Sequence, residues 1–212
     1  MPDPSRLAFF VAAALALLVV PGPAVVYIVT QSIDQGRRAG LASTGGIFSG
    51  TLVHVALATV GLSALLASSV VAFDVVKYAG AAYLVVVGLR RLAGRERTEV
   101  AGTAGGRRLG QLYRQGIVVN VLNPKTALFF LAFLPQFVDP SRGAAWRQIL
   151  VLGLLFACLG FLTDGTWALV AGTLGDWLRG NTRYLGIQRI VSGSVFVALG
   201  AVAALSAPVK SR

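Results

Sequence analysis

Charged and helix-breaking residues stand in the middle of long apolar segments of this sequence. Pro21–Pro23 interrupts the first apolar segment and Asn123–Lys125 interrupts a later one, while His54 and Asp164 each lie within a further segment. A lysine can bind an anion, and a histidine or an aspartate can exchange protons. This pattern indicates a site that binds a charged solute and moves protons inside an apolar medium.

The two interruptions leave backbone carbonyls without helical partners. Proline lacks an amide donor and clashes with the carbonyl four residues earlier, so Pro124 frees the carbonyl of Asn120. In the same way, the prolines of the first interruption free the carbonyls of Leu17 and Val19. Such breaks persist in a membrane only where protein or water satisfies the freed groups, so both should face the protein interior.

The later interruption also has the residue types that start a helix. Asparagine is a preferred N-cap and proline is favoured at the first helical position, so Asn123 should cap a half-helix that begins at Pro124. Its free amides and the charge of Lys125 would attract an anion such as a carboxylate. The alternative is a simple proline kink, with Lys125 extending towards the membrane surface.

His54 and Asp164 share helix faces with small residues. At helical spacing, Asp164 lies on one face with Ala157, Gly160, Ala168 and Ala171. In the same way, His54 lies with Gly46, Gly50, Ala58 and Gly61. Small residues indicate close helix packing, whereas an ionisable group inside a span marks a proton or substrate path. Both side chains are candidates for proton coupling, and a structural role in hydrogen bonding or packing is the alternative.

The composition places most of the chain in a membrane. Of the 212 residues, 56% are hydrophobic and 13% are charged, against about 25% charged in a soluble domain. The net charge of +11 comes without a nucleic-acid motif, so the basic residues are interpreted as membrane anchors. Cys158 is the only cysteine, which excludes an internal disulfide and a paired-thiol redox site.

Six segments are long and apolar enough to cross a bilayer, which takes about 20 residues for a helix. They are residues 7–29, 40–67, 70–91, 115–138, 147–175 and 187–207. We therefore expect an all-α membrane protein that forms one transporter domain over residues 1–212. The connection 92–114 is rich in Gly, Arg and Ala and is interpreted as a linker between two three-span halves, 7–91 and 115–207.

An odd number of spans in each half gives the two halves opposite orientations, which is an inverted-topology repeat. The interruptions fall in the first span of each half, and His54 and Asp164 fall in the second. Paired interruptions of this kind point to the binding site of a secondary transporter.

Basic residues set the predicted orientation. One side of the six spans holds twice as many as the other, namely Arg37, Arg38, Arg90, Arg91, Arg95, Arg97, Arg107, Arg108, Arg114, Arg179, Arg183 and Arg189. The positive-inside rule places this side, with the linker 92–114, in the cytoplasm. Both chain termini are then extracytoplasmic.

Three stretches and one short motif are similar to a known family. The stretches are VPGPAVVYIVTQSIDQGRRAGLASTGGIFSG (20–50), KYAGAAYLVVVGLRRL (77–92) and VVNVLNPKTALFFLAFLPQFV (118–138), and the motif is TDGTW around Asp164. On these residues the sequence resembles the LysE/RhtB family of amino-acid exporters. Carried over by matching position, the candidate substrate-binding residues are Pro21, Gly22, Pro23, Asn120, Asn123, Pro124 and Lys125.

The resemblance implies a multi-pass protein of the bacterial inner membrane that exports amino acids by proton antiport, without a cofactor or metal. Family substrates include lysine, arginine, homoserine, threonine and branched-chain amino acids. His54 departs from the family, and some exporters of basic amino acids have an acid in the second span. The absence of this acid favours a neutral substrate such as homoserine, threonine or leucine, and a basic amino acid is the alternative. The expected partners are the amino acid, protons and the lipid bilayer, with no nucleic acid, and a homodimer is left open.

Two other function classes remain as alternatives. An intramembrane enzyme would use His54 and Asp164 as a general acid and base, but no nucleophile motif or cluster of metal ligands accompanies them. Efflux of a cation or metal by a related transporter fold is the other alternative, although one His, one Cys and one buried Asp make a poor metal site. We therefore expect a transporter and not an enzyme.

Overall fold

The computed structural model describes residues 4–68 and 108–173, with single positions at Val75, Tyr78, Ala82, Val85, Val86, Leu89, Ala93, Ser194, Val197 and Ala201. All regular structure within 4–68 and 108–173 is helical, as expected for the all-α class. The predicted spans 70–91 and 187–207 lie outside these two ranges, as does most of the predicted linker.

The first apolar segment folds as two helices with a break between them. α1 (Pro4–Val19) ends before Pro21, and α2 (Pro23–Gln35) begins with proline at its first position. The two helices meet at an angle of 50° and together are long and apolar enough for one broken span. Gly22 is the N-cap of α2, and its carbonyl accepts the amide of Val26 at 2.9 Å. The predicted interruption is confirmed.

α3 (Arg37–Ser68) is a continuous helix of 32 residues, about 48 Å long at 1.5 Å per residue. It follows α2 after Gly36, whose φ of 82° lies in the region that favours glycine. α3 is long and apolar enough to cross a membrane by itself. The helix predicted at residues 40–67 is therefore confirmed.

The second interruption divides another segment in the same manner. α5 (Leu109–Val121) is followed by a two-residue turn and by α6 (Pro124–Leu128). The chain continues directly as the π-helical η1 (Phe129–Phe133) and the 3₁₀-helical η2 (Leu134–Phe137). This second part lies at 45° to α5.

The start of the second half-helix agrees with its sequence. Asn123 is the N-cap of α6, and its side-chain oxygen accepts the amide of Lys125 at 3.0 Å. The predicted cap and the predicted start at Pro124 are both confirmed. α5, however, begins at Leu109, inside the predicted linker, because Leu109–Arg114 continue the helix of the following apolar segment.

α7 (Ala145–Thr173) follows a short 3₁₀ turn, η3 (Pro140–Arg142), and confirms the helix predicted at 147–175. Its buried face includes Asp164 and all four small residues predicted beside it, namely Ala157, Gly160, Ala168 and Ala171. By itself α7 is long and apolar enough to cross a membrane.

Glycines bring α3 and α5 into close contact. A Cβ at Gly46 would overlap the carbonyl oxygen of Tyr113, and one at Gly50 would lie 2.8 Å from the Cβ of Asn120. The packing role predicted for these two glycines is therefore confirmed. Gly61 shares this face of α3 by helical spacing, but it is exposed and a Cβ there would meet open space, so it does not have the packing role of the other two glycines.

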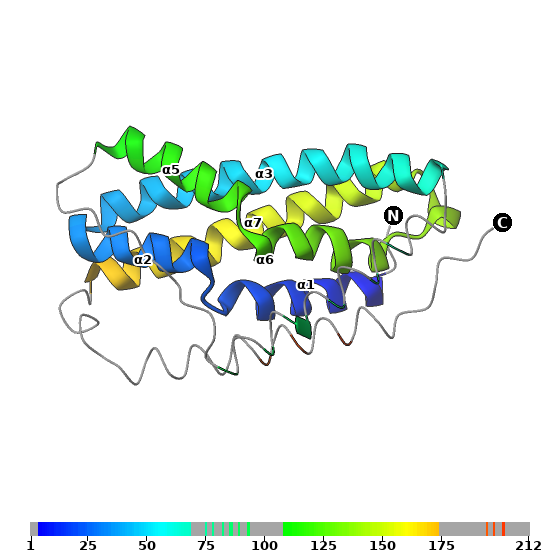
Figure 1. The fold of residues 1–212 in the computed structure, drawn as a ribbon, viewed down its shortest axis with the longest axis horizontal. Helices are drawn as coiled ribbons and strands as arrows, with labels where there is room; N and C mark the ends of the chain where they lie inside the picture. The colour runs from blue at the N-terminus through cyan, green and yellow to red at the C-terminus, as the bar shows by residue number, and fades with distance from the viewer. Residues whose placement is uncertain are drawn as a thin grey trace.

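The described parts of the two halves run in opposite directions (Figure 1). α1 and α2 lead from one end of the molecule to the other and α3 returns, whereas α5 and α6 run in the direction of α3 and α7 returns. α3 contacts α2, α5 and α7, so it lies centrally among them. Each half thus places one broken helix before one continuous helix.

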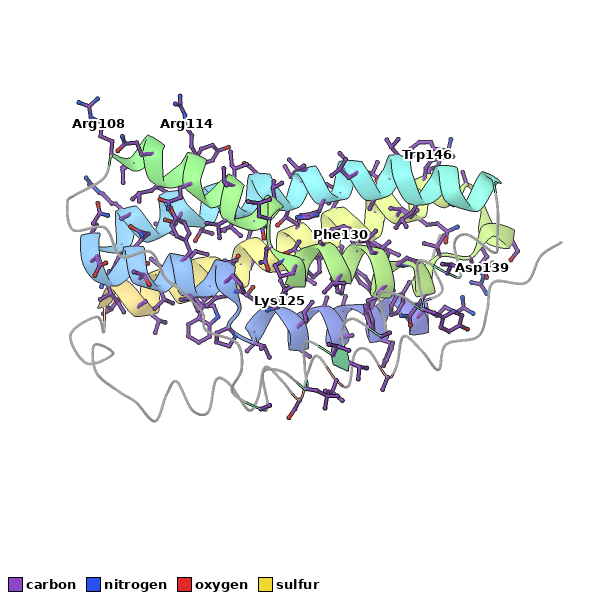
Figure 2. The ribbon with its side chains drawn as sticks, viewed as in Figure 1. Arg108, Arg114, Lys125, Phe130, Asp139 and Trp146 are labelled. Carbon is purple, nitrogen blue, oxygen red and sulfur yellow. The ribbon has the colours of Figure 1, made fainter. Side chains whose placement is uncertain are left out.

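The two ends of the bundle have different interiors. One end is filled by a phenylalanine cluster, which consists of Phe10, Phe129, Phe130, Phe133, Phe137 and Phe156. Phe129 and Phe156 stack there with ring centroids 4.1 Å apart. The half nearer Arg108 (Figure 2) instead buries a group of polar side chains, namely Gln31, Ser32, Ser43 and Thr44.

Candidate functional site

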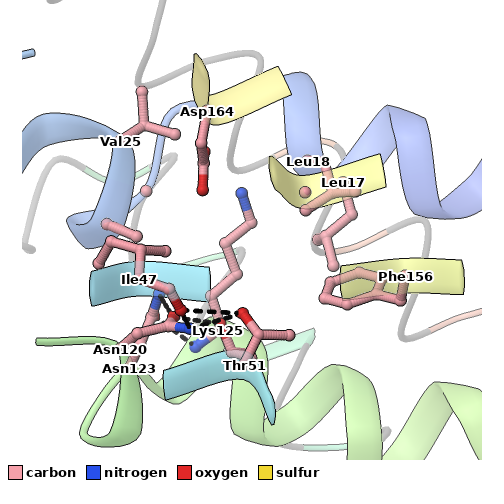
Figure 3. A pocket seen from close by; sticks show the side chains of 14 residues that line it. Leu17, Leu18, Val25, Ile47, Thr51, Asn120, Asn123, Lys125, Phe156 and Asp164 are labelled. Atoms are coloured by element: carbon pink, nitrogen blue, oxygen red, sulfur yellow. Dashed lines mark hydrogen bonds between the residues drawn. The ribbon is translucent and has the colours of Figure 1, made fainter. Parts of the chain in front are cut away.

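A small cavity lies where the two helix breaks meet α3 and α7 (Figure 3). Its polar lining residues are Thr51, Asn120, Asn123, Lys125, Thr126 and Asp164. Its apolar walls include Leu17, Leu18, Val25, Ile47 and Phe156. The cavity volume is about 30 Å³, which is room for one or two water molecules. An amino acid is larger than this, so the cavity as described has no room for one.

Lys125 connects the second break to the first. Its Nζ donates a hydrogen bond to the backbone oxygen of Val20 at 2.5 Å. The side chain passes so close to Gly22 that a Cβ at that position would lie 2.9 Å from the Cδ of Lys125. The glycine between the two prolines therefore makes room for the lysine.

The carbonyl that Lys125 binds at the first break is not one of those that the prolines were predicted to free. Counting four residues back from each proline pointed to the carbonyls of Leu17 and Val19, but the carbonyl that Lys125 binds belongs to Val20. α1 ends at Val19, so the carbonyl of Val20 lies outside the helix and can turn towards the cavity. The snorkelling alternative for Lys125 is wrong, because its side chain is buried and only 8% exposed.

Asn120 is the centre of the hydrogen bonds around the second break. Its Nδ2 donates to the oxygen of Ile47 at 2.7 Å and to the hydroxyl of Thr51 at 2.8 Å, both on α3. Its Oδ1 accepts from Asn123 at 3.3 Å and from Thr126 at 3.0 Å. With 1% of its surface exposed, the residue uses its amide group to join α5, α6 and α3.

Asp164 faces Lys125 across the cavity. Figure 3 shows the carboxylate and the ammonium pointing into the same space from opposite sides. Asp164 is 7% exposed, and its carboxylate lies across the cavity from the ammonium of Lys125. Two buried opposite charges at this position stabilise each other, since each alone would be costly in an apolar medium. The same pair presents both charges to a solute that enters between them.

His54 lies behind the second break and outside the cavity lining. Its Nε2 is 2.9 Å from the backbone oxygen of Asn120, the carbonyl that Pro124 was predicted to free. The imidazole stacks on Phe130 with ring centroids 6.0 Å apart and an interplanar angle of 15°. The freed carbonyl thus has a side-chain partner, as a buried break requires.

The structure brings together most of the sequence-predicted site residues. Gly22, Asn120, Asn123, Lys125 and Asp164 line the cavity, whereas the three prolines shape the two breaks. Sequence reasoning missed the cavity-lining hydroxyls and the aromatic wall, which are Thr51, Thr126 and Phe156. Thr51 lies three residues before His54 on one helix, and Thr126 lies two residues after Pro124, so their spacing to singled-out residues was a usable signal.

A metal site is not found within the described ranges: among residues 4–68 and 108–173, no three His, Cys, Asp or Glu side chains come close enough to hold an ion. The oxygen and nitrogen groups of the cavity instead match an organic solute with both an anionic and a cationic group. Lys125 can accept the anion, and Asp164 can accept the cation or a proton.

Comparison with known proteins gives several relatives over nearly the whole chain. The model of the family described as LysE type translocator matches residues 15–207. A homoserine/homoserine lactone efflux protein of Salmonella typhi is 31% identical over 184 residues, which is 87% of this chain and 88% of the relative. An uncharacterized membrane protein of Vibrio cholerae is 31% identical over 189 residues, or 88% and 90% of the two chains.

A leucine efflux protein of an Enterobacter species is 29% identical over 154 residues, covering 72% of this chain and 73% of the relative. No solved structure matches the chain.

Proposed function

Because the chain belongs to the LysE type translocator family, as its sequence resemblance predicts, we propose that it exports a neutral amino acid from the cytoplasm in exchange for protons. The observation that carries the proposal is the buried pair of Lys125 and Asp164, which face one cavity between two interrupted helices. Interrupted helices that meet inside the bilayer are typical of substrate sites in secondary transporters.

The substrate is a zwitterion held at both of its charges. Its carboxylate binds Lys125 at the Asn123–Lys125 break, and its ammonium binds the carboxylate of Asp164. Substrate binding then replaces the direct attraction between these two side chains, so that neither buried charge is left unpaired. The hydrogen bond from Lys125 to Val20 also loosens, which gives the substrate a means to separate the two breaks.

Proton coupling follows from competition for Asp164. On the cytoplasmic side the ionised carboxylate holds the substrate ammonium. On the outer side a proton binds the carboxylate and displaces the substrate ammonium. The transporter then returns with Asp164 protonated and without substrate. One acid that binds either the ammonium or the proton gives antiport, because the two are never carried together. Asp164 is favoured over the second candidate, His54, because Asp164 lines the cavity.

The walls of the cavity favour a substrate with a neutral side chain. The lining around Lys125 and Asp164 is completed by aliphatic residues and Phe156, and Asp164 is the one acid among the described lining residues. A lysine or arginine substrate would need a second buried carboxylate for its side chain. Relatives named for efflux of homoserine and of leucine point in the same direction.

The interior of the bundle supports loading from the end that bears Arg108. Buried polar side chains lie between the cavity and that end, whereas the phenylalanine cluster closes the other end. We place the Arg108 end in the cytoplasm by the positive-inside rule. The protein then lies in the inner membrane with both termini outside, the 92–114 linker inside and the two halves as inverted three-span repeats of one domain.

Exchange in proteoliposomes tests the proposed substrate class. Purified protein is reconstituted into liposomes preloaded with unlabelled homoserine, leucine, threonine or lysine, and uptake of the matching labelled amino acid is followed. We expect exchange of at least one neutral amino acid at ten or more times the rate of lysine. Preference for lysine would contradict the neutral class, and exchange of none of a full set of amino acids would contradict export of amino acids altogether.

A further inference from the structure

The imidazole of His54 occupies the place of a missing backbone donor. In a regular helix the amide of residue 124 would bind the carbonyl of Asn120, but proline has no amide hydrogen. The oxygen of Asn120 accepts the amide of Asn123 at 3.0 Å, and the Nε2 of His54 lies 2.9 Å from the same oxygen. A carbonyl can only accept, so the Nε2 atom carries a hydrogen and donates it.

The position of the ring is fixed by several contacts. The residue is 8% exposed, and its ring lies nearly parallel to that of Phe130 in η1. The same face of α3 supplies the carbonyl of Ile47 and the hydroxyl of Thr51 to the side chain of Asn120. Three residues on one face of α3, namely Ile47, Thr51 and His54, therefore hydrogen-bond to Asn120. The first two bind its side-chain amide and the third binds its backbone carbonyl.

These hydrogen bonds between α3 and Asn120 determine where Lys125 lies. Asn120 holds Asn123 and Thr126 through its Oδ1, and Asn123 caps the amide of Lys125. A shift of Asn120 away from α3 would move the whole start of the second half-helix. We propose that His54 is a positioning residue, whose imidazole N–H holds the interrupted helix at Asn120 and so places Lys125 in the substrate cavity.

The inference assigns His54 a role other than proton carriage. Lys125 and Asp164 are the charged side chains among the described residues that line the cavity, and His54 is connected to this lining through Asn120. Because Nε2 donates to a backbone oxygen, His54 could take up a further proton only at Nδ1, and His54 is not among the described residues that line the cavity. The sequence left open whether His54 couples protons or has a structural role, and this geometry favours the structural role.

Transport by two variants of His54 distinguishes a positioning role from proton carriage. His54→Gln places an amide donor near the position of Nε2 but cannot take up a proton, whereas His54→Leu removes the donor. We expect His54→Gln to keep the pH profile and a KM within about threefold of the wild type. We expect His54→Leu to raise KM tenfold or more with an unchanged pH profile. A shifted pH profile or lost proton coupling in His54→Gln would overturn the proposal, as would an unchanged KM in His54→Leu.

A double-mutant cycle with Pro124 tests the contact without any transport assay. Pro124→Ala restores a backbone amide that can bind the Asn120 carbonyl, so the imidazole donor becomes dispensable there. We expect His54→Leu to lower the melting temperature of the detergent-solubilised protein clearly in the wild type and much less in the Pro124→Ala background. Equal losses in both backgrounds would overturn the proposal. Because this readout needs no substrate, it stays independent of the proposed function, on which the KM test rests.

Discussion

The Nζ atom of Lys125 lies 2.5 Å from the backbone oxygen of Val20, a residue 105 positions earlier in the chain. This hydrogen bond joins the break of the first half to the break of the second. A group that competes for the ammonium therefore acts on both broken helices together. Export by alternating access needs such a connection, because the two halves must change their relation when the substrate binds.

Removing the charge of Lys125 should weaken substrate binding. A charge-assisted hydrogen bond contributes about 1.5–3 kcal/mol, so Lys125→Met should raise the apparent Kd for the exported amino acid roughly 10- to 150-fold. Binding of labelled substrate to purified protein measures this effect. Arg114→Met serves as the control, because Arg114 is an exposed basic residue of α5. Equal affinity of Lys125→Met and the control would remove Lys125 from the site.

A methyl group at Gly22 should displace the stem of Lys125. The added Cβ would lie 2.9 Å from the Cδ of the lysine, so the side chain must shift at a cost of about 1–3 kcal/mol. We expect Gly22→Ala to reduce the transport rate at least fivefold in proteoliposomes. Gly165→Ala is the matched control, because it lies next to Asp164 but has open space. Equal transport rates in the two variants would contradict a close contact between Gly22 and Lys125.

Substitution of Gly46 should destabilise the contact between α3 and α5. Its Cβ would overlap the backbone oxygen of Tyr113, and a backbone group cannot move aside as a flexible side chain can. We expect Gly46→Ala to lower the melting temperature in detergent by several degrees. Gly61→Ala lies on the same helix with free space around it, and a helix gains from this change. A melting temperature equal to that of Gly61→Ala would contradict the close packing.

The proposed exchange moves one net positive charge inward in each cycle. The substrate is a zwitterion without net charge, and one proton enters for each molecule exported. Each 100 mV of inside-negative potential should therefore favour export by about 2.3 kcal/mol. Valinomycin and a potassium gradient can impose this potential on oriented proteoliposomes at equal pH, and we expect faster and more complete efflux. Efflux that does not respond to the potential would require a different stoichiometry.

Local chemistry made much of the fold predictable. Proline removes a donor wherever it stands, so both breaks and the cap at Asn123 follow from a few neighbouring residues. The helical period, which is also a local property, placed Asp164 on the buried face of α7. The start of α5 was misplaced because Leu109–Arg114 are polar enough to look like a linker, although they extend the next helix.

The contacts that define the site were not predictable in this way. Lys125 meets Val20 and His54 meets Asn120 across 105 and 66 positions of sequence, and only the packing of whole helices brings them together. The exposure of Gly61 is likewise set by the packing of neighbouring helices and not by its spacing along α3. Sequence therefore identified many of the residues that line the cavity, and the tertiary arrangement decided their partners.

The most direct test of coupled export measures substrate and proton movements in one preparation. Proteoliposomes contain a pH-sensitive dye and labelled leucine or homoserine, whichever the wild type exchanges faster, and an inward proton gradient is imposed. We predict substrate efflux with matching proton entry for the wild type, and loss of both for Asp164→Asn in protein that still purifies as a folded species. Efflux and proton entry in Asp164→Asn at the wild-type rate and with the wild-type pH dependence would contradict the account.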